Sequence, residues 1–153
     1  MVEILVGLGL FAILGVGVAV MLFATLRGAR KTTAINVANN EGRHALNLMA
    51  QMTRFAKVAQ CPSPTSLTLT KTDDTTMSYS LSGTAIASGS ANLTSQRVTV
   101  TACSGTMFTC SGRTVQICFN IDAAGAADVT ETAEGVGTGI KFVTTVTLRN
   151  YGI

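Results

Sequence analysis

The chain has 153 residues, of which 47% are hydrophobic and only 12% are charged, and its formal net charge is +3. This length allows one compact domain and an N-terminal segment. The charge is too sparse and too weakly positive to favour nucleic acid as a partner. The one histidine and the lack of closely spaced cysteine pairs give no sign of an enzyme, a metal site or a cofactor.

Residues 1–26 form an almost continuous apolar segment, in which Glu3 is the only charged residue. As a helix rising ~1.5 Å per residue, this segment would extend roughly 39 Å, enough to cross the hydrocarbon core of a bilayer. It lacks the basic start of a signal peptide and exceeds the usual apolar region of about 7–15 residues. Because every side of the helix is apolar, we expect lipid or a bundle of identical helices to surround it.

Glu3 allows two interpretations. A carboxylate in the first turn stabilises a helix by interacting with the positive end of its dipole. Alternatively, an acid inside an apolar segment pairs with a positive group on another chain, because an unpaired charge there is costly.

Residues 27–60 are predicted to continue the helix in amphipathic form. Apolar and small residues recur there at steps of three or four and form a stripe along one side of the helix. Its members are Ile35, Ala38, Gly42, Ala45, Met49, Met52, Ala56 and Ala59. Leu48 and Phe55 widen this stripe. Pro62 and Pro64 cannot continue a helix, so we expect it to end near Gln60.

Residues 61–153 are predicted to form a β-rich globular head. Alternating patterns indicate strands at 66–70, 77–81, 97–102, 114–121 and 140–148. We expect turns at 71–75 and 111–113, a loop at 84–96 with room for a short strand, and a surface loop at 122–139. The expected fold is α+β: a long N-terminal α-helix, with a hydrophobic half and an amphipathic half, packed on a C-terminal antiparallel β-sheet head.

Four cysteines, Cys61, Cys103, Cys110 and Cys118, all follow the apolar segment. Their even number favours two disulfides in an oxidising compartment, although four cysteines allow three connectivities. Cys103 and Cys110 could close a hairpin, which would leave Cys61 to pair with Cys118. Their spacings do not match the close pairs of structural zinc sites.

Other polar residues give weak signals. His44 lies near the edge of the amphipathic stripe without a sequence-visible Asp or Cys companion, so we expect a surface or packing role. Asp73 and Asp74 fall in a predicted turn, where Asp bonds to the local backbone; a cation site is the weaker alternative.

The run MVEILVGLGLFAILGVGV resembles the start of a processed type IV pilin or pseudopilin, in which an apolar helix carries one glutamate near the mature N-terminus. The downstream order is also similar: an amphipathic helix, Thr/Ser-rich strands and a closing TTVTLRNYGI. Two residues, often Phe and Thr, usually precede this stretch in the family. We therefore expect Met1 not to be the natural mature N-terminus.

This resemblance implies a structural, non-enzymatic subunit of a type IV pilus-like filament, which polymerises through its N-terminal helix. The implied partners are copies of itself, a prepilin peptidase and an ATP-driven assembly machinery in the inner membrane. The subunit would cross the cytoplasmic membrane once, with its head outside, before joining an extracellular surface filament. The alternatives are a minor pilin or secretion-system pseudopilin, and a monomeric membrane-anchored extracellular binding module.

The expected contacts between subunits lie in the apolar segment. Its glycines either reflect the ordinary composition of membrane helices or allow close helix packing in a filament core, where Gly15 and Gly17 would be the place at which the helix unwinds. The predicted assembly residues are Glu3, Ile4, Leu5, Leu8, Leu10, Phe11, Leu14, Gly15 and Gly17. Arg27, Arg30 and Lys31 follow this segment, and the positive-inside rule would keep them cytoplasmic. The cysteines instead favour a head outside the cytoplasm, because disulfides form in oxidising compartments. We expect this second orientation.

Overall fold

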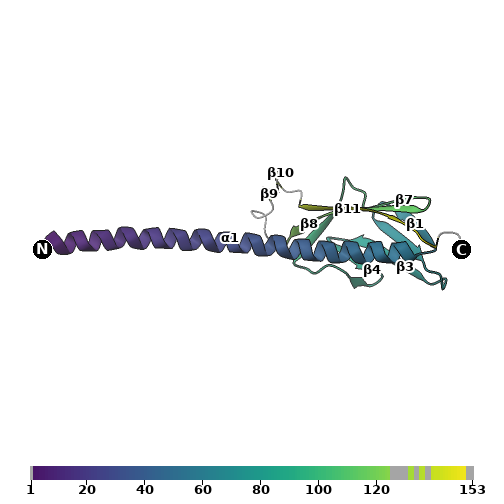
Figure 1. The fold of residues 1–153 in the computed structure, drawn as a ribbon, viewed down its shortest axis with the longest axis horizontal. Coiled ribbons are helices and arrows are strands. Elements are labelled where there is room, and N and C mark those ends of the chain that lie inside the picture. The colour runs from purple at the N-terminus through teal and green to yellow at the C-terminus, as the bar shows by residue number, and fades with distance from the viewer. Residues whose placement is uncertain (1, 125–130, 133–134, 137–138, 151–153) are drawn as a thin grey trace. The chain divides into compact units, whose positions relative to one another are not determined.

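A computed structural model gives the architecture of the chain (Figure 1). It describes the backbone at residues 2–124, 131–132, 135–136 and 139–150, and the side chains at residues 4, 7, 9, 13–124 and 139–150. The chain divides into two compact units, residues 1–33 and residues 34–153.

One helix, α1 (Val2–Phe55), belongs to both units. The first unit consists of this helix alone, and the second combines residues 34–55 of the helix with all of the strands. No proline interrupts the sequence before Pro62, and the apolar first half followed by an amphipathic second half is confirmed as helical. The unit boundary lies near residue 33, within the helix.

The helix ends at Phe55, about one turn before the predicted end near Gln60. The backbone N–H of Lys57 donates a hydrogen bond to the carbonyl of Thr70 at 2.8 Å, so the chain joins a neighbouring strand before either proline is reached. The last helical carbonyls are satisfied by the C-terminal segment: Arg149 N donates to Arg54 O at 2.9 Å, and Asn150 Nδ2 donates to Phe55 O at 3.2 Å. Long-range pairing therefore ends the helix, and not the prolines.

The first sheet is a five-stranded antiparallel meander in sequence order. Its strands are β1 (Val58–Ser63), β2 (Ser66–Thr70), β3 (Thr76–Ser82), β4 (Ala85–Ser88) and β5 (Ala91–Asn92). The predicted strands at 66–70 and 77–81 are confirmed, and β4 and β5 lie in the predicted loop at 84–96. β1 includes Pro62, which a strand tolerates at a sheet edge, and β1 is an edge strand of this sheet.

The second sheet has the order β11-β8-β6, and β7 also pairs with β8. Its strands are β6 (Val98–Ala102), β7 (Phe108–Ser111), β8 (Thr114–Ala123) and β11 (Ile140–Thr147). β6 pairs with the second half of β8 and β7 with the first half, both antiparallel, so β6 and β7 lie one after the other along the same edge of β8. Within the predicted loop at 122–139, β9 (Glu131–Thr132) and β10 (Gly135–Val136) pair with each other. Residues 125–130, 133–134 and 137–138 of that loop lie outside the described residues.

The core of the second unit lies between the helix and the strands (Figure 1). The helix contributes mainly small residues and Met49, and the strands contribute the larger side chains, including Leu67, Tyr79, Phe108, Phe119 and Ile121. This arrangement confirms the α+β prediction of a helix packed against antiparallel sheets.

The buried stripe differs from the predicted one near the helix end. Thr53 is fully buried, whereas Phe55, which we expected to widen the stripe, is 50% exposed. Helical geometry explains both results: at 100° per residue, Thr53 lies about 40° from Met49 around the axis, and Phe55 about 120° away. Ala56, directly after the last helical residue, is fully buried.

Candidate functional site

The large apolar side chains that the structure describes in the first unit are all exposed. α1 contains a window of 18 residues, between Ile13 and Phe55, with a mean hydropathy of 1.5 and 0% of it buried. Large apolar side chains there are between 55% and 73% exposed, and they are Ile4, Ile13, Leu14, Val16, Val18, Val20, Met21, Leu22, Phe23 and Leu26. Several are consecutive in sequence, so they point in every direction around the helix. The segment is therefore long and apolar enough to span a membrane.

The predicted assembly residues occupy this same helical segment. Ile4 and Leu14 are exposed, and α1 continues without interruption through Gly15 and Gly17. A Cβ atom added at either glycine would meet no atom of the chain within 4 Å, so neither is required by packing inside the chain. The side chains of Glu3, Leu5, Leu8, Leu10 and Phe11 lie outside the described residues, and the two interpretations of Glu3 remain open.

The four cysteines form two disulfides, Cys61–Cys110 and Cys103–Cys118, as the prediction of two disulfides requires. Their connectivity differs from the pairing suggested by a hairpin between Cys103 and Cys110. Because β6 and β7 follow one another along one edge of β8, Cys103 and Cys110 do not face each other across a hairpin. Cys103 instead lies beside β8, next to the Ala102–Phe119 pair, and reaches Cys118.

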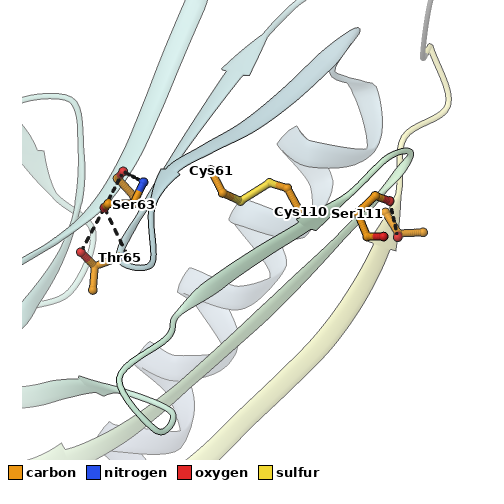
Figure 2. The surroundings of a disulfide bond; sticks show 7 residues. Cys61, Ser63, Thr65, Cys110 and Ser111 are labelled. Carbon is orange, nitrogen blue, oxygen red and sulfur yellow. Dashed lines mark hydrogen bonds between the residues drawn. A yellow bond between two sulfur atoms is a disulfide. The ribbon is translucent and has the colours of Figure 1, made fainter.

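The Cys61–Cys110 disulfide joins the two sheets. Cys61 lies on β1 of the first sheet and Cys110 on β7 of the second, with 5.8 Å between their Cα atoms (Figure 2). Backbone hydrogen bonds join the sheets nearby, because Met107 N and Phe108 N both donate to the carbonyl of Pro64, at 2.8 Å and 3.0 Å. The second unit is thus a head whose two sheets are fastened covalently as well as by hydrogen bonds.

These two features, the uncovered apolar helix and the cross-linked head, are what a function has to explain. No family model, curated protein or solved structure matches the chain. The geometry of the chain and the resemblance of its first 18 residues are therefore the two indications of function.

The head also carries an open polar groove of about 470 Å³. It is lined by Asn40, Glu41 and His44 of the helix and by residues 92–95. Glu41 accepts hydrogen bonds from Ser95 N at 2.7 Å and from Ser95 Oγ at 2.5 Å, which fastens the segment after β5 to the helix. No sequence pattern indicates this contact, because the two residues lie 54 positions apart.

His44 is exposed at this groove, as expected for a surface residue. Glu41 is its acidic neighbour on the helix, but that carboxylate is engaged by Ser95. Among the described residues, no three His, Cys, Asp or Glu side chains lie close enough to hold a metal ion. The groove therefore offers polar surface for binding and no recognisable set of reactive groups.

The acidic turn after β2 has a local structural role. Asp73 Oδ1 accepts hydrogen bonds from Thr75 Oγ1 at 2.6 Å and Thr75 N at 3.0 Å, and these bonds lower the pKa of the Asp73 carboxyl. Asp74 adopts a positive φ of 59° and pairs with Lys57 at 3.3 Å. The predicted turn with local backbone bonding is confirmed, and the two carboxylates have these protein partners.

Proposed function

We propose that this chain is a structural subunit of a type IV pilus-like filament that polymerises through its N-terminal helix. The observation that carries the proposal is the apolar surface of the first unit, whose described large side chains are all more than half exposed. Fully burying one large apolar side chain stabilises a protein by roughly 1.5–3 kcal/mol, so a helix with ten such side chains exposed has a strong tendency to associate. Lipid covers this surface before assembly, and the helices of neighbouring copies cover it afterwards.

The head supports an extracytoplasmic location in the proposal. Two disulfides are typical of proteins in oxidising compartments, and a small β-rich head gains stability from them. In the proposed life cycle, the chain crosses the cytoplasmic membrane once with its head outside. A prepilin peptidase and an inner-membrane assembly machinery, which the resemblance implies, then deliver it to a surface filament.

Removing residues 1–26 tests the proposal. We expect the full chain, after removal of detergent, to form filaments that electron microscopy can see, and the shortened chain to stay a soluble monomer in light scattering. The second unit contains its own core and both disulfides, so the shortened chain remains folded. Mass spectrometry before and after reduction and alkylation checks that both disulfides are present in it. Filaments formed by the shortened chain would show that the head alone associates and would overturn the proposed role of the helix.

A monomeric membrane-anchored binding module is the second candidate, and the polar groove at Glu41 and His44 is the feature that favours it. The two candidates differ in what surrounds Leu14. A photo-reactive amino acid at Leu14 should cross-link one copy to another in a filament, and only to lipid in an anchored monomer. The same amino acid at Gln51, which is exposed on the helix of the head, controls for random collisions.

A further inference from the structure

Three cations lie directly after the apolar segment. Arg27 precedes Arg30 by three residues and Lys31 by four, which places it beside each of them on α1, within about one turn. Arg27 and Arg30 are exposed and Lys31 is partly buried. Leu26, immediately before them, is the last of the exposed large apolar side chains of this unit. The cluster therefore marks the point where the apolar surface ends.

The first unit contains no nearby counter-charge for this cluster. Its only acidic residue is Glu3, roughly 36 Å away along the helix axis. The ion pair between Lys57 and Asp74 in the second unit does not involve the cluster. The hydroxyls of Thr32 and Thr33 donate to the carbonyls of Gly28 and Ala29, so they bond to the helix itself.

We propose that Arg27, Arg30 and Lys31 bind the phosphates of anionic phospholipids in the leaflet on the side of the head; this inference depends on the membrane-inserted state in the proposed function. A helix whose apolar residues fill the hydrocarbon core places the next residues at the depth of the headgroups. Arginine and lysine extend apolar stems along that boundary and keep their charges in the polar layer. Guanidinium groups bind phosphate through paired hydrogen bonds, and each cation at an anionic surface adds to the attraction.

The proposal also explains why a basic cluster is tolerated on the side opposite to the one that the positive-inside rule favours. Phosphate contacts compensate the three charges there, and they are lost when the subunit leaves the membrane. Lipid charge thus becomes a factor that controls extraction of the subunit into a filament.

The test reconstitutes the full chain in vesicles of phosphatidylcholine and phosphatidylglycerol at a ratio of about four to one, with a trace of either lipid spin-labelled on its acyl chain. Electron spin resonance then measures which lipid lies next to the protein. We expect phosphatidylglycerol to be preferred roughly fivefold or more, the factor that one basic side chain contributes at an anionic surface. About 1 M salt should reduce this preference strongly, because charges are then screened beyond ~3 Å.

The triple variant Arg27→Gln, Arg30→Gln and Lys31→Gln should lose the preference, while Arg27→Lys with Arg30→Lys should keep most of it. Glutamine has nearly the helix propensity of lysine and arginine, so the helix is retained. Arg43→Gln is the matched control, because Arg43 is an exposed cation of α1 outside the first unit. This control should leave the preference unchanged.

Equal affinity of the native chain for both lipids would overturn the proposal, and so would a triple variant that keeps the native preference. A triple variant that keeps the lipid preference but assembles poorly would assign the cluster to a contact with a second copy. The filament proposal is tested separately. A native chain that prefers anionic lipid but never polymerises would support lipid binding by the cluster and would overturn the filament proposal.

Discussion

Gly42 is a residue at which the helix and the second sheet pack closely together. A Cβ atom at this position would overlap the ring of Phe142, which stacks on Phe119 with 5.5 Å between ring centroids. Gly42→Ala should therefore destabilise the head by about 1–3 kcal/mol, as overpacking does, although alanine is the better helix former by up to about 1 kcal/mol. Urea denaturation of the chain without residues 1–26 measures this. Gly28→Ala, where added atoms meet nothing within 4 Å, is the control, and an equal or higher stability for Gly42→Ala would contradict the packing.

The pKa of the Asp73 carboxyl depends on the hydrogen bonds that Thr75 donates to it. These hydrogen bonds favour the ionised form, so the pKa of the Asp73 carboxyl is lowered. The stability that the hydrogen bonds contribute is therefore present above the ordinary pKa of a free Asp. It is lost as the pH falls through the lowered pKa. Thr75→Val removes the hydroxyl donor and should raise the pKa of Asp73 towards its ordinary value. NMR titration of the side-chain carboxyl measures the change. An unchanged pKa would show that the backbone donor alone is responsible.

Glu3 is the residue whose charge distinguishes a pairing site from a simple helix-start acid. If helices pack together, its buried carboxylate requires a cation, and the nearest candidate is the α-amino group of an adjacent copy. Glu3→Gln retains the shape and removes the charge, so the variant should insert into membranes normally but join filaments poorly. Membrane fractionation measures insertion, and electron microscopy measures filament formation. Assembly of Glu3→Gln at the native rate and register would leave only the helix-start role.

At the scale of elements, the two disulfides should not be equivalent. Cys61–Cys110 closes a separation of 49 residues and Cys103–Cys118 one of 15. If each constrains the unfolded chain, replacing Cys61 and Cys110 by serine should cost about 1 kcal/mol more than replacing Cys103 and Cys118, within a total loss of roughly 2–5 kcal/mol for either pair. Urea denaturation of the two double variants compares them. A smaller loss for the Cys61–Cys110 pair would show that contacts within the second sheet matter more than loop length.

Elements with a regular local pattern could be predicted from the sequence, and elements made by distant pairing could not. The strand at 66–70 alternates Ser or Thr with leucine, and the structure gives the same bounds. β1 was missed because VAQCPS lacks alternation and contains a proline, and its partner β2 alone makes it a strand. The disulfide pairing was not predictable for the same reason, since it depends on β6 and β7 sharing one edge of β8.

At the scale of the whole molecule, composition was the most informative signal. The hydrophobic first 26 residues, the amphipathic continuation and the Thr/Ser-rich remainder led to the α+β arrangement that the structure has. The sequence could not give the groove around Glu41, because it forms where the helix meets residues 92–95. Assembly is a property of several copies, so it remains a prediction that filaments and cross-links will test.

The bond between Cys61 and Cys110 has a mechanical consequence. Cys61 follows the end of α1 after only five residues, 56–60, so tension applied along the helix reaches this cysteine almost at once. The load then passes through the sulfur–sulfur bond to Cys110, and the backbone between the two cysteines, which includes β2 to β6, carries no tension. Under oxidising conditions β2 to β5 of the first sheet are therefore shielded from stretching, and a reductant would make the same pulled chain extensible.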